Sequence, residues 1–260
     1  MLRTAVRFCV VVVLLAWFAA EGRTAENPIG VPILVYHRFG SVAADSMTVT
    51  TPVFEAQLAW LRERGYRFLS LRTVVDATCG TETPLPAKSV AITADDGHAS
   101  VYSEMFPVVQ RYHVPVTLFI YPSAISNASY ALTWDQLSAM LRAGGIDVQS
   151  HTFWHPNFRI EKARLGAAEY QAFVDSQLVR SKERIAARLG IRPPDLLAWP
   201  FGIHDPELAQ AARRAGYTAA FTLERRHAQP GTDCFALPRY LMTDHDRGAR
   251  FAAIFGEPKS

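Results

Sequence analysis

Two adjacent carboxylates, Asp95 and Asp96, lie directly after an apolar run and just before Gly97. Adjacent carboxylates repel each other and are costly to remove from water, so a cation or hydrogen-bond donors must compensate them. Because neighbouring side chains of a strand diverge, this pair is not placed to flank one bond as glycosidase carboxylates do. It can divide the work, one carboxylate binding a metal and the other taking a proton from water activated by that metal. The competing interpretation is a turn, since Asp-Gly is a common turn dipeptide.

Two histidines, His151 and His155, stand four residues apart after a second apolar run. On a helical turn this spacing points both imidazoles the same way, so their nitrogens can reach one ion at about 2.0–2.1 Å. A pair of this kind also occurs on solvated helix faces, and alone it indicates little. With a carboxylate from another strand it supplies three ligands and leaves a position for water, as is typical of a catalytic divalent-metal site. The sequence therefore predicts a metal centre.

These residues come together only if the chain alternates strands and helices. Short apolar runs predict strands at 31–36, 67–69, 90–93, 116–120, 146–149, 196–198 and 219–222. Helices are predicted from Thr51, as N-cap of Pro52, to Gly65 and over 102–112, 134–143, 166–189 and 206–215. Thr133 and Gln136 have the spacing of a capping box. The alternation indicates a single α/β domain with a parallel sheet, closed as a barrel or doubly wound.

The residues that could take part in catalysis or metal binding follow directly after the predicted strands. In a parallel β/α barrel the loops converge at the C-terminal ends of the strands, and chemistry collects there. The residues just past the apolar runs are His37, Asp95, Asp96, His151, Pro200, Phe201 and Gly202. Different strands thus deliver them to what we expect to be one rim.

Composition narrows the class of protein. The chain has 260 residues, 49% of them hydrophobic and 20% charged, which excludes a disordered chain, a collagen-like repeat and a disulfide-framework miniprotein. With 27 Lys and Arg against 24 Asp and Glu the formal charge is +3, and no long basic run indicates a nucleic-acid partner.

The N-terminus has the features of a signal peptide. Arg3 and Arg7 precede an apolar run over 8–20 that is short for a membrane span, and small residues allow a cut after Gly22. We therefore expect residues 1–22 to be removed and the protein to be exported, either periplasmic or secreted. The alternative is an uncleaved N-terminal anchor. The remaining chain, 23–260, keeps Cys79 and Cys234, which can pair in an oxidising compartment, although their spacing does not establish it.

The two motifs resemble those of a known family. Thr93-x-Asp95-Asp96-Gly97 followed by His151-Thr152-x-x-His155 is similar to the first two motifs of the polysaccharide deacetylases (carbohydrate esterase family 4, the NodB-homology domain). Residues 32–37 and 198–202 resemble the opening strand and third motif, most closely in the branch with biofilm poly-N-acetylglucosamine deacetylases, and 237–239 has a counterpart near the domain's end. The resemblance runs from Val31 to Arg239. It implies a distorted (β/α) barrel, usually of seven strands, for the domain at 23–260.

The resemblance also implies roles for individual residues. Asp96, His151 and His155 would bind a divalent metal, with zinc the usual occupant, and Asp95 would be the general base. Water attacks the acetamide carbonyl of an N-acetylated sugar, the oxyanion is stabilised, and a general acid protonates the departing amine. The products would be acetate and a free amino sugar.

The chain departs from the family pattern at two points. Ala94 stands where the family usually has Phe. The smaller side chain leaves space beside the base, which either stays open or is filled by His98 or Trp199. The late motif that supplies the general acid in many members has no clear counterpart. The candidates for this acid, in order of preference, are His37, His245, His98 and His204.

Several further residues are candidates for the substrate groove. We expect Tyr36, Pro200, Phe201, Gly202 and Arg239 to contact substrate. Arg239 is also placed to pair with Asp95 and lower its pKa, or to form an ion pair at the edge of the core without a catalytic role. The aromatic residues near the predicted rim either line a glycan groove or belong to the core. They are Tyr36, Phe39, Phe153, Trp154, Trp199, Phe201 and Tyr240.

These features predict an exported, metal-dependent N-deacetylase whose partner is a polysaccharide or oligosaccharide containing N-acetylhexosamine. Two alternatives stay open. One is a glycan-binding barrel that keeps the metal ligands without turnover, and the other is a metal-dependent amidase or esterase for a smaller substrate. The sugar linkage and the oligomeric state are not indicated by the sequence.

Overall fold

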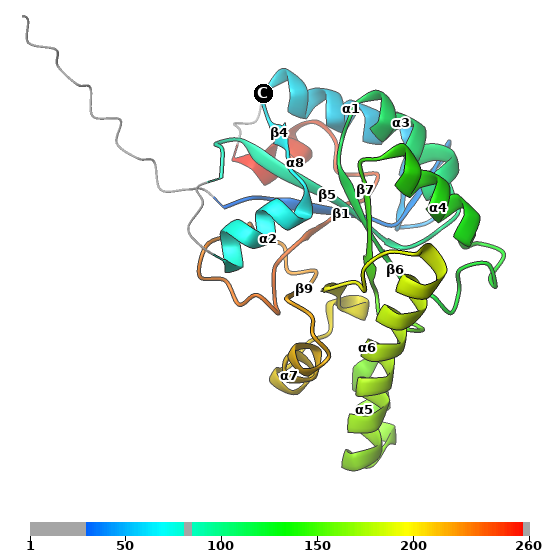
Figure 1. Cartoon of the computed structure of the whole chain (residues 1–260). Coiled ribbons are helices and arrows are strands. Elements are labelled where there is room, and N and C mark those ends of the chain that lie inside the picture. Colours follow the sequence, from blue (N-terminus) through cyan, green and yellow to red (C-terminus); the bar gives the residue numbers. More distant parts are fainter. Residues whose placement is uncertain (1–29, 81–84, 257–260) are drawn as a thin grey trace, which may run out of the picture.

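The computed structural model describes residues 30–80 and 85–256 (Figure 1). The predicted signal segment, 1–22, lies outside the described residues, so its cleavage stays a prediction. No helix among the described residues combines the length and apolar character needed to cross a membrane.

Parallel strands form the centre of the molecule, in the order β10-β1-β5-β6-β7-β8-β9, and β4 pairs with the start of β5. The strands are β1 (Ile33–Tyr36), β4 (Arg67–Phe68), β5 (Ser89–Asp96), β6 (Val116–Ile120), β7 (Ile146–Ser150), β8 (Leu196–Ala198), β9 (Ala219–Phe221) and β10 (Tyr240–Leu241). A separate pair, β2 (Arg38–Gly40) and β3 (Thr48–Thr50), follows β1. The predicted strands are confirmed, whereas β2, β3 and the two-residue β10 were not predicted.

The segment between β9 and β10 closes the sheet into a barrel. The Leu237 N–H donates to the Ala220 carbonyl at 2.9 Å, and the Leu237 carbonyl accepts from the Thr222 N–H at 2.8 Å. Further along, the Met242 N–H donates to the Val35 carbonyl of β1 at 2.9 Å. The short stretch that contains β10 thus bonds to β9 on one side and to β1 on the other. The predicted distorted (β/α) barrel with seven strands around its wall is confirmed, and the doubly wound alternative is excluded.

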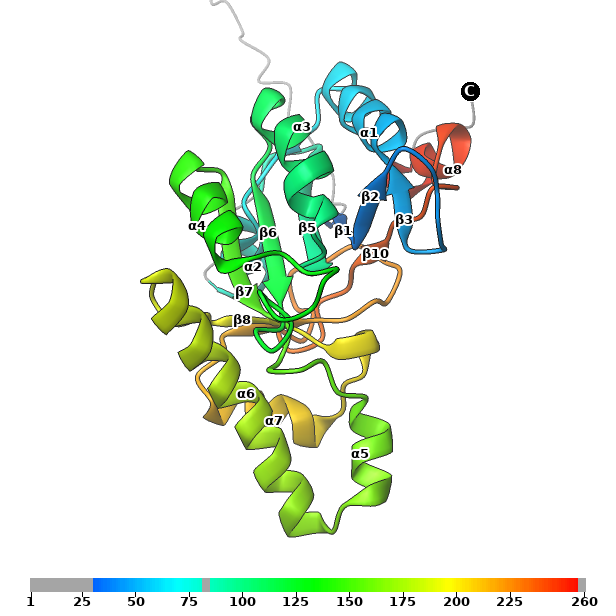
Figure 2. The ribbon, with the colours of Figure 1, turned by 90° about the vertical axis from the view of Figure 1, so that its right-hand side faces the viewer.

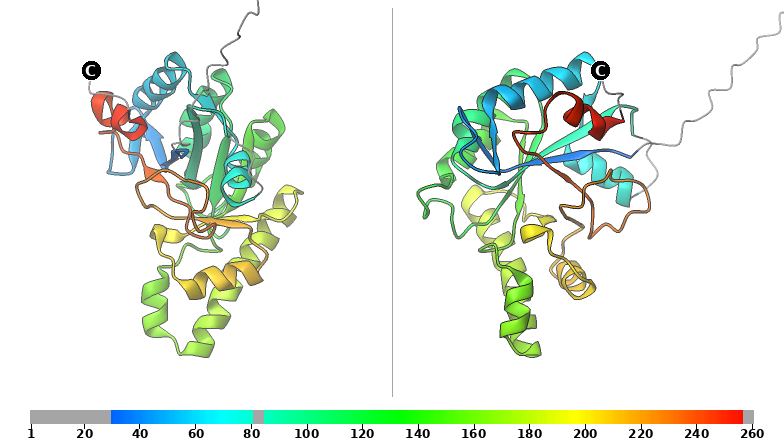
Figure 3. Two further views of the ribbon diagram at one scale, coloured as in Figure 1. Left: turned by 90° about the vertical axis from the view of Figure 1, so that its left-hand side faces the viewer. Right: turned by 180° about the vertical axis from the view of Figure 1, so that it is seen from behind.

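Helices cover the outside of the barrel (Figures 1 and 2). They are α1 (Thr51–Glu63), α2 (Leu71–Cys79), α3 (Phe106–Arg111) after a π-helical turn (Val101–Met105), α4 (Trp134–Ala143), α5 (Phe158–Arg164), α6 (Ala167–Leu189), α7 (Pro206–Arg214) and α8 (Gly248–Ala252). The bounds of α4 and its capping box match the prediction, but α1 has Thr50 rather than Thr51 as N-cap. Helices α2, α5 and α8 were not predicted. Figure 3 shows α8 beside α1, where Phe251 packs on Trp60 with ring centroids 5.4 Å apart.

The alternation of side chains along each strand decides which residues reach the interior of the barrel. In β5, Ile92 and Ala94 belong to the core under the helices, whereas Ala91 belongs to the interior cluster and Asp95 continues that face. Ala94 therefore points away from the base, and the expectation that it opens space there is wrong. In β1 the same alternation puts Tyr36 under the helices and lets His37 follow on the inner side.

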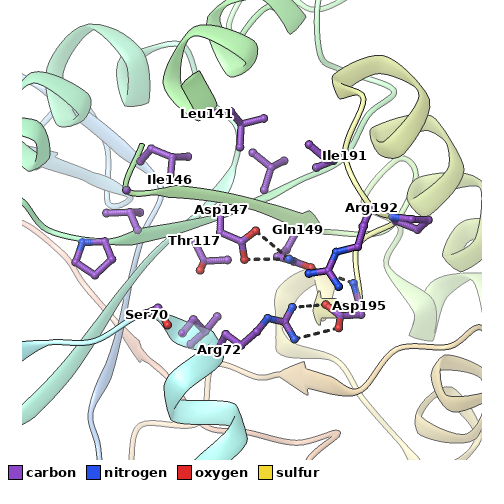
Figure 4. A pocket seen from close by; sticks show the side chains of 16 residues that line it. Ser70, Arg72, Thr117, Leu141, Ile146, Asp147, Gln149, Ile191, Arg192 and Asp195 are labelled. Atoms are coloured by element: carbon purple, nitrogen blue, oxygen red, sulfur yellow. Dashed lines mark hydrogen bonds and ion pairs between the residues drawn. The ribbon is translucent and has the colours of Figure 1, made fainter. Parts of the chain in front are cut away.

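Helix α2 closes the end of the barrel opposite the C-terminal rim. Its Leu71, Val74 and Val75 pack with interior residues of the strands. A cavity of about 620 Å³ lies here, between the start of α2 and the first residues of β6 and β7 (Figure 4). Across it Arg72 donates to both carboxylate oxygens of Asp195. None of Asp95, Asp96, His151 and His155 lines this cavity.

A disulfide ties the end of α2 to the loop after β9. Cys79 and Cys234 are bonded, their Cα atoms lie 5.6 Å apart, and 155 positions separate them in the chain. A cross-link over so long a loop strongly reduces the conformational entropy of the unfolded chain. The pairing that the sequence left open is therefore present in the structure.

Removing this cross-link with Cys79→Ala/Cys234→Ala is expected to lower the free energy of unfolding by about 3–5 kcal/mol. Urea unfolding of both proteins measures the change, and the parent protein under reducing conditions should behave like the variant. An unchanged free energy of unfolding in the variant contradicts the prediction.

Candidate active site

The predicted aspartates and histidines converge at the C-terminal rim of the barrel. The Nε2 atom of His151 lies 3.8 Å from Asp95 Oδ2 and 3.6 Å from Asp96 Oδ1. His155 Nε2 lies 3.6 Å from the same Asp96 oxygen. Residues from β5 and from the loop after β7 therefore form one cluster.

Unusual backbone conformations make this convergence possible. Asp96 has φ of 70°, which breaks the pleat at the end of β5, so both carboxylates face His151 instead of diverging. Thr152 and His155 also have positive φ, 65° and 63°. The two histidines thus approach through an irregular turn, and the predicted helical turn is wrong. Such conformations cost about 1–3 kcal/mol each and persist where the surroundings impose them, often at functional sites.

Side chains of helix α6 hold the segment 150–155, which carries both histidines. The buried hydroxyl of Ser150 bonds to Ser181 of α6 at 2.8 Å and accepts from Tyr217 at 2.8 Å. One turn away, the buried Gln177 accepts a hydrogen bond from the Trp154 N–H at 3.1 Å. A buried polar network fixes the backbone that carries both histidines.

Arg239 holds Asp95 from inside the barrel. Its Nη1 and Nη2 atoms donate to the two carboxylate oxygens at 2.8 and 2.7 Å, and its Nε donates to the Thr222 carbonyl at 3.1 Å. Burial opposes the ionisation of Asp95, but the Arg239 guanidinium outweighs it and the pKa falls to about 2. The predicted ion pair is confirmed. Since Arg239 has 0% of its surface exposed, its predicted contact with substrate is wrong: it positions Asp95.

Asp96, His151 and His155 have the donor set of a metal site. Their ligand atoms all lie within 4.8 Å of one another. Asp96 Oδ1 is buried without a hydrogen-bond partner, and burial raises the pKa of this carboxyl. His151 Nδ1 lies 2.7 Å from the Ala198 carbonyl, which fixes the proton on Nδ1 and leaves Nε2 as an acceptor. Burial, with the neighbouring His155 adding to it, lowers the pKa of His151 to about 3, so the ring is neutral as a ligand must be.

His37 follows β1, which pairs with β5 so that Tyr36 lies opposite Ala94, the residue before the two carboxylates. His37 is buried, its Nδ1 has no hydrogen-bond partner, and its charge would lower the pKa of Asp96 and of Asp95. The other candidate acids are placed differently. His98 bonds to Ser100 Oγ at 2.8 Å, and His204 and His245 are exposed with no described contact to the cluster.

The predicted substrate residues divide into two groups. Phe201 is 57% exposed and its ring lies 4.6 Å from that of His155, so it forms part of the rim. Pro200 is buried and Gly202 half-buried, and a Cβ at Gly202 would stand 2.9 Å from the Leu223 nitrogen. Tyr36 is fully buried and donates to Gln57 at 2.8 Å, so the prediction that it contacts substrate is wrong.

Other aromatic residues also separate into core and rim. Trp199 is buried and donates to the Phe235 carbonyl, away from Asp95. Trp154 is exposed. Tyr121, which was not predicted, lies with its ring 5.3 Å from His155 and bonds to the exposed Tyr130 at 2.7 Å. Tyr121 directly follows β6, so the rule that identified the other rim residues also applies to it.

Comparisons with known proteins agree with this geometry. The family model for polysaccharide deacetylase matches residues 82–220. The chain is 27% identical to poly-β-1,6-N-acetyl-D-glucosamine N-deacetylase of Escherichia coli K12 over 89% of its own length, and it spans only 40% of that relative. Among solved structures it resembles IcaB from Ammonifex degensii, with 25% sequence identity and a TM-score of 0.76 over 88% of this chain and 97% of that one. It also resembles the Streptococcus pyogenes deacetylase PplD in complex with acetate, with 23% identity and a TM-score of 0.77 over 89% of this chain and 100% of that one.

Proposed function

Because the chain belongs to the polysaccharide deacetylase family, we propose that it is a metal-dependent hydrolase that removes N-acetyl groups from an N-acetylhexosamine polymer or oligomer. The observation that carries the proposal is the ionised Asp95, held by Arg239, beside the cluster of Asp96, His151 and His155. A protein that only binds glycan has no use for a proton acceptor at that place. The E. coli relative is named for β-1,6-linked poly-N-acetylglucosamine, so oligomers with that linkage are the first substrates to test.

Asp96, His151 and His155 would hold the divalent ion, and zinc is the first candidate because two imidazoles and one carboxylate suit it. When bound, such an ion supplies a Lewis acid that polarises the acetamide carbonyl and makes water a stronger nucleophile. The unpartnered Asp96 Oδ1 and the acceptor Nε2 of His151 support this assignment, since a carboxylate oxygen and a neutral imidazole nitrogen are both zinc ligands.

Asp95 would orient the attacking water and accept its proton. Arg239 donates one hydrogen bond to each Asp95 oxygen and keeps the carboxylate ionised. Of the two oxygens, Oδ2 lies 3.8 Å from His151 Nε2. A general acid must then protonate the departing nitrogen, because an amide nitrogen leaves poorly as an anion.

His37 is the group that we assign to this transfer, as general acid. His37→Ala is expected to lower kcat on N-acetylated oligomers by about 10²- to 10⁴-fold with metal content unchanged. An activated acetate ester needs no acid to release its alcohol, so the variant should keep its activity on that substrate. The matched variant is His245→Ala, for which we expect normal rates on both. Loss of amide turnover in His245→Ala instead would move the role to that residue.

Acetate release tests the proposed function. The protein would be assayed on β-1,6-linked N-acetylglucosamine oligomers of increasing length, with zinc, with a chelator and with zinc restored. We expect release that rises with length, stops with the chelator and returns with the metal. No release from a metal-loaded protein on any oligomer would refute the proposal, and assays on unrelated amides and esters would then follow.

We further propose that the protein acts outside the cytoplasm. The apolar segment at 8–20 and the Cys79–Cys234 disulfide support this, because structural disulfides persist in oxidising compartments. Fractionation of cells with an antibody to the chain tests it, and recovery of the whole protein from the cytoplasm would exclude it.

A further inference from the structure

A second cavity, of about 310 Å³, lies between the loop after β6, helices α4 and α6, and Phe153 of the loop that carries His151 and His155. We call it the arginine pocket. Its lining residues are Pro122, Ser123, Ile125, Ser126, Asn127, Trp134, Phe153, Arg184 and Arg188. The lining contains two guanidinium groups and no carboxylate. Its volume is at the lower end of the range of small-ligand sites, roughly 300–1,000 Å³.

The arginine pocket shares a wall with the candidate active site. The Ser123 N–H donates to the Phe153 carbonyl at 3.1 Å, and Phe153 lies in the loop between His151 and His155. Tyr121, two residues before Ser123, packs against His155. A glycan bound at the cluster of Asp96, His151 and His155 can therefore extend toward this pocket.

Arg184 and Arg188 line the pocket, and Arg180 stands one turn before Arg184 on the same helix. Arg180, Arg184 and Arg188 follow one another at intervals of four along α6, so they share one face of the helix. Like charges at this spacing destabilise a helix by about 0.2–0.5 kcal/mol per pair. Within the described part of the chain none of the three has a carboxylate partner, whereas Arg213 and Arg214 of the neighbouring α7 pair with Asp233 and Asp175.

The arginines at the two ends of this row are held by aromatic rings. The Arg180 guanidinium carbon lies 4.0 Å from the ring centre of Phe153, and that of Arg188 lies 5.4 Å from the ring centre of Trp134. A guanidinium stacked on a ring keeps its N–H groups free for planar recognition of an anion. The Ser126 hydroxyl accepts from the Trp134 N–H at 3.0 Å and so retains its own proton to donate.

We propose that the arginine pocket is a subsite for an anionic group, a carboxylate, phosphate or sulfate. The group would be carried by the glycan a short distance from the N-acetyl group under attack, or taken up as a free anion. The glycan-borne form rests on the proposed function and narrows its substrate class to N-acetylated glycans with acidic substituents. Pairing with an anion would relieve the repulsion among the three arginines.

Acetate release from two matched substrates tests the proposal. One is a β-1,6-linked N-acetylglucosamine pentamer bearing an O-carboxymethyl group, and the other bears the uncharged carbamoylmethyl group of the same shape. We expect the parent protein to prefer the acidic pentamer by about tenfold in kcat/KM, since a charge-assisted hydrogen bond contributes roughly that much. Arg184→Gln/Arg188→Gln should lose the preference. The control, Arg62→Gln/Arg64→Gln at the C-terminal end of α1, removes the same charge elsewhere, and we expect it to keep the preference.

Calorimetric titration of the same three proteins with inorganic phosphate identifies the source of the anion. Phosphate binding that disappears only in Arg184→Gln/Arg188→Gln, without a preference between the pentamers, supports a free anion as ligand. Absence of both the preference and this phosphate binding overturns the subsite. If no protein releases acetate from either pentamer, the proposed function fails and the phosphate titration alone decides on the arginine pocket.

Discussion

Replacing Asp95 by asparagine is expected to lower acetate release by about 10²- to 10⁴-fold while the metal stays bound. The amide has the shape of the carboxylate but cannot take a proton from the attacking water. The metal should stay because Asp96, His151 and His155 hold it without Asp95. Steady-state rates together with the zinc content of the purified variant measure both effects. Turnover at the parent rate would show that the base is another group.

The same substitution leaves Arg239 buried without a counter-charge, which typically costs about 3–5 kcal/mol. A loss of activity could therefore come from a damaged fold. Asp95→Asn/Arg239→Gln removes both charges, and we expect it to recover stability against urea but not activity. The matched single variant is Asp147→Asn, on β7 at the opposite end of the barrel, which should retain both. Recovered activity in the double variant would refute the role of Asp95 as base.

The sequence predicted the parts of the fold whose signals are local. Parallel strands buried on both faces read as apolar runs, so β5 to β9 were found from short segments. The rule that parallel strands deliver their loops to one rim then brought His37, Asp95 and His151 together across long stretches of chain. Helix α4 was predicted to the residue because its capping box marks the start and a glycine the end.

The errors have physical causes that short windows of sequence do not contain. The strand alternation that buries Tyr36 under the helices depends on which face of β1 is the inner one. The positive φ of Asp96 and His155 is imposed by surrounding packing, since neither residue type requires it. The ion pair of Asp95 with Arg239 joins positions 144 apart in the chain. Their spacing in the sequence does not indicate such a pair, and the resemblance of the motifs to the family suggested it.

Removal of a histidine ligand is the other change with a large expected effect. His151→Ala should lower zinc affinity by more than the 10- to 100-fold that is typical of changes outside the ligand shell. Acetate release should fall by about 10³-fold, which corresponds to the loss of several kcal/mol of Lewis-acid stabilisation of the transition state. His151 is buried and bonded to Ala198, so its loss could also disturb the fold.

His155→Ala therefore serves as a second variant, because that side chain is 20% exposed and its removal disturbs less packing. Both variants should lose zinc and activity together, whereas the exposed His204→Ala should keep both. Excess zinc should partly restore turnover in His155→Ala, since two ligands remain, and a folding defect would not respond to zinc. A variant that retains stoichiometric zinc at parent affinity would refute the assignment of that histidine, because a lost ligand must weaken the site whose three donor atoms lie within 4.8 Å of one another.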